Sequence, residues 1–259
     1  MKHYVLRTII LLVLSLSFFD LAFSQNSIQD SVQQSLQLQN AINLYHQSLI
    51  PETGLYNGSE YAYKAYYPYA INEGDPFFIS REFYSGSVFY NGLLYQNIPL
   101  LYDIIKGELL TKDLSQINII RLNEEKVRWF TIYNQTFYRL VKDSIAKNTV
   151  STDFYDGLYI GNTSLYKHVS KIFKENSSSA QGINRYVVEK DEFFIKKGNE
   201  YFRINNRKSL LNVLSDRKKD IGQFMSKSKL KLKKNKEDAF IKVVTYYDGL
   251  TGSTIQANK

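Results

Sequence analysis

The sequence predicts a mainly β fold of the α+β class. We expect an antiparallel meander curled into a half-barrel or barrel-like sheet, with an N-terminal helix and C-terminal helices. Over residues 55–206, short runs rich in Val, Ile, Thr and aromatic residues alternate with turn signals. The starts of most of these runs lie about 6 to 12 residues apart, which leaves no room for crossover helices between them and favours antiparallel pairing.

The expected β domain, residues 55–206, contains a series of candidate strands. They are residues 87–90, 93–96, 100–105, 108–111, 117–122, 127–133, 136–141, 156–160, 164–172, 185–189, 192–196 and 201–204. Asn91-Gly92 and Gly198-Asn199 fit hairpin turns because Asn and Gly tolerate a positive φ. Lys190-Asp191 is interpreted as one more turn. Many short strands of this kind curl or close into barrels, half-barrels or sandwiches.

The first 24 residues have the pattern of a secretory signal peptide. Lys2 and Arg7 precede an apolar run at 8–19, and Ala22-Phe23-Ser24 supplies small residues before a cut at Gln25. The run is shorter than the roughly 20 residues of a transmembrane helix, although a retained membrane anchor is the alternative. Since no Cys follows, we expect residues 25–259 in the periplasm or outside the cell, without a lipid anchor.

Helical spacing of apolar residues appears on both sides of the β domain. Residues 26–48 form an expected amphipathic helix within an N-terminal segment, 25–54. Residues 207–250 are expected to form C-terminal helices, with Gly249 as the last stop signal. The small, polar residues 251–259 are expected to be a disordered tail.

The basic character of the chain comes from one segment. Residues 217–236 hold nine Lys and Arg residues against Asp220 alone, a net charge of +8. A nucleic-acid-binding protein would spread such charge over a docking face. We therefore expect contact with an anionic surface, and the alternative is a solvated linker between two helices. The expected contact residues are Lys227, Lys229, Lys231, Lys233, Lys234 and Lys236.

The sequence lacks the residues that several kinds of catalysis require. The chain has no Cys, which excludes thiolate nucleophiles, thiolate zinc sites, iron–sulfur clusters and disulfides. Beyond the expected signal peptide, the only histidines are His46 and His168, and neither adjoins a nucleophile motif. Neither a phosphate-binding glycine motif nor a calcium loop motif occurs. We expect no catalytic residue, metal or cofactor.

Carboxylates leave one enzymatic alternative open. A glycoside hydrolase needs two carboxyl groups facing each other across a cleft. Glu82 and Asp103 fall in the aromatic-rich part of the chain and are candidates for such a pair. Their separation in space does not follow from the sequence.

Aromatic residues are concentrated in one part of the chain. From Tyr56 to Tyr102 there are 14 Phe and Tyr residues, including five Tyr at 61–69. A strand shows only alternate residues to the core, so some rings should be exposed or line a pocket. The alternative is that they form the core of the sheet. The expected ligand-binding residues are Tyr61, Tyr63, Tyr66, Tyr67, Tyr69, Phe83 and Tyr84.

Motifs along most of the chain resemble a group of uncharacterised secreted proteins from Bacteroidota. They are "LYNGSEY", "DPFF", "GSVFYNGLLYQNIPLLYDI", "EEKVRWF", "FYDGLYIG" and "YYDG". The resemblance implies a location in a Gram-negative envelope and a single shared architecture. It carries over no functional residue.

The favoured function is that of a secreted, non-catalytic envelope protein. Its aromatic β surface and lysine segment would bind a ligand or partner: an anionic envelope component, a glycan or an envelope protein. Nucleic acid is not an expected partner. The alternatives are a glycan-directed hydrolase with paired carboxylates and an assembly factor that pairs through its β-edges.

Overall fold

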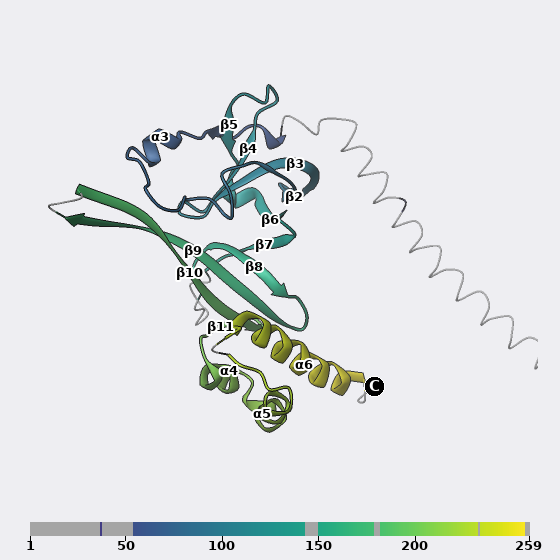
Figure 1. Ribbon diagram of the computed structural model, residues 1–259. Coiled ribbons are helices and arrows are strands. Elements are labelled where there is room, and N and C mark those ends of the chain that lie inside the picture. Colours follow the sequence, from purple (N-terminus) through teal and green to yellow (C-terminus); the bar gives the residue numbers. More distant parts are fainter. Residues whose placement is uncertain (1–36, 38–53, 143–149, 179–181, 233, 257–259) are drawn as a thin grey trace, which may run out of the picture. The chain divides into compact units, whose positions relative to one another are not determined.

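The computed structural model describes Gln37 and residues 54–142, 150–178, 182–232 and 234–256 (Figure 1). The chain divides into two compact units, Met1–Pro51 and Glu52–Lys259, and the sheet and helices below belong to the second unit. The expected signal peptide, almost all of the expected N-terminal helix, and His46 lie outside the described residues.

One open antiparallel sheet dominates the second unit. Its 11 strands, among the residues described, follow the order β1-β5-β4-β3-β2-β6-β7-β8-β9-β10-β11. The strands are β1 Ser59–Glu60, β2 Tyr84–Tyr90, β3 Leu93–Asp103, β4 Glu108–Lys112, β5 Ile119–Arg121, β6 Val127–Ile132, β7 Gln135–Leu140, β8 Asp153–Tyr159, β9 Thr163–Ser178, β10 Gly182–Lys197 and β11 Glu200–Ile204. The two end strands do not pair with each other. The predicted antiparallel, mainly β fold is confirmed, in its open form.

Two meanders meet in this sheet. Strands β2 to β5 pair in chain order, and β6 to β11 do the same. The short 3-10 helix η1, Glu124–Lys126, leads from β5 into β6, which returns to pair with β2. The predicted hairpin turn Asn91-Gly92 connects β2 and β3, with φ of 49° and 83° at its two residues. These positive values are the geometry that Asn and Gly accept in a two-residue turn.

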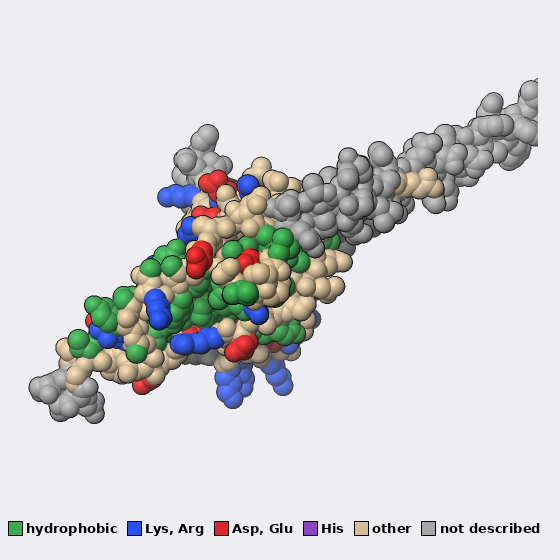
Figure 2. Space-filling view, turned by 90° about the horizontal axis from the view of Figure 1, so that it is seen from above, with side chains coloured by type: hydrophobic (Ala, Val, Ile, Leu, Met, Phe, Trp, Pro, Cys, Tyr) green, Lys and Arg blue, Asp and Glu red, His purple; other side chains and the backbone are tan. Residues whose placement is uncertain are grey.

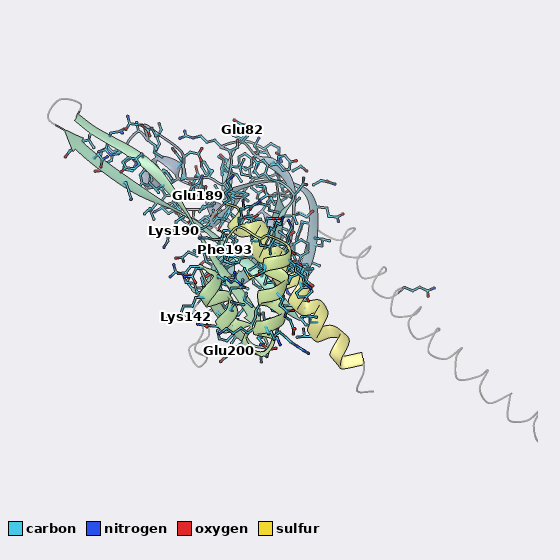
Figure 3. All side chains as sticks on the ribbon, turned by 60° about the horizontal axis from the view of Figure 1, so that its bottom comes forward. Glu82, Lys142, Glu189, Lys190, Phe193 and Glu200 are labelled. Carbon is cyan, nitrogen blue, oxygen red and sulfur yellow. The ribbon has the colours of Figure 1, made fainter. Side chains whose placement is uncertain are left out.

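Two strands are longer than the sequence predicts. β10 runs without a break from Gly182 to Lys197, so the predicted turn at Lys190-Asp191 is wrong. Figure 3 shows Glu189, Lys190 and Phe193 along one continuous ribbon. β3 likewise joins the predicted strands 93–96 and 100–105, with a bulge opposite Gly86 that absorbs the irregularity.

The main core of the sheet is aromatic and aliphatic. Phe130 of β6 and Phe137 of β7 are cross-strand partners, with nearly parallel rings whose centroids lie 5.0 Å apart. Tyr102 and Phe154 meet Phe130 edge-on, as aromatic rings prefer. Many of the chain's aromatic residues therefore stabilise the sheet. This agrees with the alternative interpretation of the aromatic segment, in which its rings form the core of the sheet.

The helices pack together against the β8–β11 end of the sheet. They are α4 Arg207–Val213, the 3-10 helix η2 Ser215–Arg217, α5 Lys218–Lys227 and α6 Lys236–Gln256; a further short helix, α3 Tyr63–Tyr66, lies in the aromatic segment. Leu214, Ile221 and Phe240 are fully buried in their shared core. α6 continues through Gly249 to Gln256, so the predicted stop at Gly249 is wrong and residues 251–256 of the expected tail are helical. Residues 257–259 lie outside the described residues. Among the residues described, no helix has the length and apolarity needed to cross a membrane.

Candidate functional site

The aromatic segment packs mostly into the protein. Tyr61 and Tyr67 are only 6% and 7% exposed. Tyr63, Tyr66 and Phe83 are partly buried in the same cluster as Tyr61, Phe77, Leu101, Leu110 and Ile119. Of the seven predicted ligand-binding rings, Tyr69 and Tyr84 are the well exposed ones, at 64% and 43%. The expectation that some of these rings are exposed holds for Tyr69 and Tyr84, whereas Tyr61 and Tyr67 contact protein and are not available to stack on a ligand.

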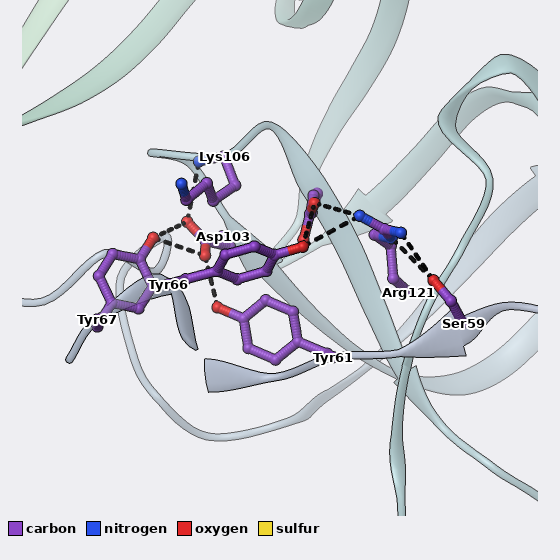
Figure 4. Close-up of polar contacts among 8 residues, drawn as sticks. Ser59, Tyr61, Tyr66, Tyr67, Asp103, Lys106 and Arg121 are labelled. Atoms are coloured by element: carbon purple, nitrogen blue, oxygen red, sulfur yellow. Dashed lines mark hydrogen bonds and ion pairs between the residues drawn. The ribbon is translucent and has the colours of Figure 1, made fainter. Parts of the chain in front are cut away.

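Asp103 explains why two of these tyrosines turn inward. The Tyr61 hydroxyl donates to Asp103 Oδ2 at 2.6 Å, and the Tyr67 hydroxyl lies 2.9 and 2.8 Å from the two carboxylate oxygens (Figure 4). The backbone N–H of Lys106 donates to Oδ1 at 3.1 Å. A buried carboxylate requires such donors, so the segment 61–67 is tied to the end of β3.

This arrangement removes support for the predicted carboxylate pair. Asp103 is 0% exposed, and its oxygens are occupied by Tyr61, Tyr67 and Lys106. Burial raises the pKa of Asp103, and the tyrosine hydrogen bonds partly offset that rise. Glu82, by contrast, lies in an exposed loop. A general acid or base must reach the substrate, which Asp103 does not.

A second polar network lies beside the first. Arg121 contacts Glu108 Oε1 at 2.9 Å and Ser59 Oγ at 2.8 Å, and the Tyr66 hydroxyl is 3.1 Å from the guanidinium (Figure 4). Ser59, Glu108 and Arg121 border an open cavity of about 380 Å³. Because its charges pair with one another, the network mainly joins β1 and α3 to β4 and β5.

The strongest candidate for a binding site is a cavity of about 890 Å³ among the helices, which we call the basic pocket. Its lining residues are Asn205, Asn206, Arg207, Met225, Leu230, Lys231, Leu232, Lys234 and Lys236. Four of them are cationic and none is acidic. Met225, Leu230 and Leu232 add an apolar component, so the lining combines positive charge with hydrophobic surface.

The cations of the basic pocket have no acidic partners among the residues described. No ion pair involves Arg207, Lys231, Lys234 or Lys236 in that part of the chain. The nearest acidic residues along the chain are engaged elsewhere. Glu237 contacts Lys167 at 2.8 Å, and Asp238 contacts Lys242 at 2.8 Å. The positive charge of the pocket is therefore available to an anionic ligand.

Local sequence signals position these cations. Asn206 caps α4 by accepting a hydrogen bond from Ser209 N at 3.0 Å, which places Arg207 at the first helical position. Asn235 accepts a hydrogen bond from Asp238 N at 3.2 Å and fixes the start of α6 at Lys236. Both helix starts thus point a cation toward the same cavity.

The predicted lysine contacts divide into two groups. Lys231, Lys234 and Lys236 line the basic pocket, whereas Lys227 and Lys229 are exposed but do not line it. Lys233 lies outside the described residues. Arg207 is a member that the sequence did not reveal, and the Asn205-Asn206 capping signal before it was the available clue.

His168 serves a structural contact. Its Nε2 lies 2.9 Å from Asp153 Oδ2, and its ring stacks on Tyr155 at 4.7 Å. In the described parts of the chain, no group of three His, Asp or Glu residues is arranged to hold a metal ion.

Hydrophobic side chains, tyrosines included, cover much of the face seen in Figure 2, with Lys, Arg, Asp and Glu side chains around them.

Comparison with protein-family models, with curated proteins and with solved structures finds no match to this chain. Function is therefore inferred from the geometry of the sites.

Proposed function

We propose that this protein is a non-catalytic binding protein that holds an anionic amphiphile, a molecule with a phosphate headgroup and an apolar part, in the basic pocket. The observation that carries the proposal is the lining itself: four cations without acidic partners in the described chain, beside Met225, Leu230 and Leu232. Guanidinium and ammonium groups bind phosphate oxygens, and the apolar side chains suit the hydrocarbon adjoining a headgroup.

The charges supply most of the expected affinity. A Lys or Arg near an anionic lipid surface contributes about 1 kcal/mol. Three lysines therefore contribute about 3 kcal/mol, on the order of a hundredfold in affinity. Partial burial of apolar groups adds to this, but the pocket is open to solvent, so charge should dominate.

We further propose that the protein works in the envelope of a Gram-negative bacterium. The signal-peptide pattern at 1–24 supports export, and the resemblance to secreted proteins of Bacteroidota supports the same location. Phosphate-bearing lipids are abundant at membrane surfaces, so an exported protein with a basic pocket would meet the ligand class it fits.

Vesicle sedimentation tests the proposal. Vesicles of phosphatidylcholine with added phosphatidylglycerol should sediment the protein, and vesicles of phosphatidylcholine alone should not. Competition by inorganic phosphate distinguishes a lipid headgroup from a soluble phosphate compound as the ligand. If free phosphate competes fully at low millimolar concentration, the ligand is a soluble phosphate compound and the lipid is not required.

Variants locate the effect in the pocket. The triple variant Lys231→Gln, Lys234→Gln, Lys236→Gln should lose on the order of a hundredfold in vesicle affinity. The matched control is Lys64→Gln, Lys142→Gln, Lys174→Gln, three exposed lysines that do not line the pocket. The pair Lys227→Gln, Lys229→Gln should weaken binding only slightly. Equal losses in all three variants would show nonspecific charge attraction and overturn the proposal.

A further inference from the structure

A second cavity, of about 380 Å³, lies where β2 begins and the β6–β7 turn reverses the chain. Its lining residues are Tyr84, Ser85, Gly86, Ser87, Asn97, Thr131, Ile132, Tyr133, Asn134 and Thr136. We call it the neutral pocket, because its lining contains no Asp, Glu, Lys, Arg or His. Hydroxyl and amide groups dominate instead.

This composition differs from the other cavities. The basic pocket carries four cations, and the cavity at Arg121 carries both signs of charge. Uncharged donors and acceptors beside aromatic rings match an uncharged ligand that has many hydroxyl groups and an apolar ring face. Neutral sugars have both properties.

Tyr84 supplies a ring for such a ligand. Its ring packs against that of Tyr133, with centroids 4.3 Å apart and planes inclined by 32°. The Tyr133 hydroxyl in turn donates to Glu82 O at 3.4 Å. Tyr84 is thereby supported from one side while 43% of its surface stays exposed.

Three residues with polar side chains at this cavity have a positive φ, which Asn accepts readily and Tyr does not. Asn97, Tyr133 and Asn134 have φ of 57°, 51° and 62°, in the left-handed region that favours glycine. Gly86 allows close approach of β2 and β6, because a Cβ there would lie 2.1 Å from Thr131 O. Tyr133 is the unusual residue of the three, because a bulky side chain seldom adopts this conformation, and such backbone outliers often occur at binding sites.

From these observations we propose that the neutral pocket binds one pyranose unit of an uncharged glycan, with Tyr84 stacking on the sugar ring and Ser85, Asn97 and Asn134 bonding its hydroxyl groups. The inference does not depend on the basic pocket, whose ligand class is anionic. A single open subsite of this kind binds weakly, in the millimolar range, because few groups contact the ligand.

Amide chemical shifts test the inference on the full protein. The probes are soluble hexasaccharides of glucose, mannose, galactose and N-acetylglucosamine, each titrated to millimolar concentration. At least one should shift the amides of residues 84–87 and 131–136 and leave those of 205–236 in place. If none of the four shifts the residues of the neutral pocket, the inference is overturned.

Two variants separate binding from folding. Tyr84→Ala removes an exposed ring and should weaken sugar binding on the order of tenfold or more. Its control, Tyr69→Ala, removes another exposed ring outside the pocket and should leave binding unchanged. Glycine also adopts the φ of 62° found at residue 134, so Asn134→Gly should raise or preserve the melting temperature while weakening binding. Sugar binding that is unchanged in both Tyr84→Ala and Asn134→Gly would also overturn the inference.

Discussion

Asp248, in the last part of α6, accepts a hydrogen bond from the backbone N–H of Thr163 at 2.8 Å. The same carboxylate accepts from Asn162 N at 3.2 Å and from the Tyr159 hydroxyl at 3.0 Å. It is buried, and it ties the C-terminal helix to the turn between β8 and β9. Asp248 belongs to the sequence "YYDG" and Gly161 to "FYDGLYIG", so these two segments, far apart along the chain, meet at one structural contact.

Removal of this carboxylate should loosen α6. We expect Asp248→Ala to lower the free energy of unfolding by about 2–4 kcal/mol, because it leaves buried donors without their charged acceptor. Urea denaturation followed by circular dichroism measures the change. The control, Asp238→Ala, removes an exposed carboxylate of the same helix and should cost about 0.5 kcal/mol. Equal costs would show that the clamp does not stabilise the fold.

Two glycines should respond in opposite directions to alanine. At Gly161 a Cβ would lie 2.3 Å from Asp248 Oδ2, so Gly161→Ala should destabilise the protein by about 1–3 kcal/mol. At Gly249, inside α6, a Cβ would meet nothing within 4 Å, so Gly249→Ala should stabilise it by about 0.5–1 kcal/mol. Thermal melting of both variants checks this. If Gly249→Ala destabilises, the helix ends at Gly249 after all.

Asp156 should make stability depend on pH. Burial raises its pKa to about 6, Lys167 Nζ lies 3.7 Å from its Oδ2, and that oxygen has no hydrogen-bond donor in the described chain. Because the folded protein binds this proton more tightly than the unfolded chain does, the Asp156 carboxyl stabilises the fold below its ordinary pKa of 3.8. That stabilisation is lost as the pH rises through about 6. Wild type should therefore lose on the order of 2 kcal/mol between about pH 4 and 7 that Asp156→Asn retains.

Denaturant unfolding across that pH range gives the comparison. Asp220→Asn, at a partly exposed position on α5, is the control and should follow the wild-type curve. If Asp156→Asn instead loses stability in parallel with wild type, the carboxyl of Asp156 is not the group responsible.

The Asp103 network should affect stability but not ligand binding. Tyr67→Phe removes a hydroxyl that lies within 2.9 Å of both oxygens of a buried carboxylate, and we expect a cost of about 1.5–3 kcal/mol. Tyr69→Phe, at an exposed ring, should cost less than about 0.5 kcal/mol. Vesicle affinity should stay at the wild-type value in both. A loss of affinity in Tyr67→Phe at unchanged stability would give the tyrosine cluster a binding role.

The sequence predicted most strands because they are short, apolar and separated by turn residues. It failed at β10, where Glu189, Lys190 and Asp191 resemble a turn although they continue a long hairpin. The charged middle of this hairpin is exposed, so its pairing with β9 needs no apolar alternation. At Gly249 the sequence predicted the end of a helix, but α6 continues beyond this residue because Val243, Val244 and Tyr247 pack into the core of the helices.

The sites were only partly predictable for a related reason. The lysines of 217–236 were found from composition, but the cavity also needs Arg207 and Met225, which only the packing of α4 and α5 brings to Leu230 and Leu232. The buried positions of Tyr67 and Tyr61 depend on hydrogen bonds to Asp103, which lies 36 and 42 residues away from them along the chain. Hydrophobic periodicity predicts which residues share one face of a strand or helix, but it does not predict which distant carboxylate will accept their hydrogen bonds.

An amide chemical-shift titration with the soluble lipid dihexanoyl phosphatidylglycerol tests whether the basic pocket binds an anionic headgroup. The chemical-shift changes should concentrate at Asn205, Asn206, Arg207 and residues 225–236, and they should weaken in the triple variant Lys231→Gln, Lys234→Gln, Lys236→Gln. Dihexanoyl phosphatidylcholine should produce much smaller shifts at the same residues. Equal shifts with both lipids, or shifts that avoid the basic pocket, would contradict the claim that it binds an anionic headgroup.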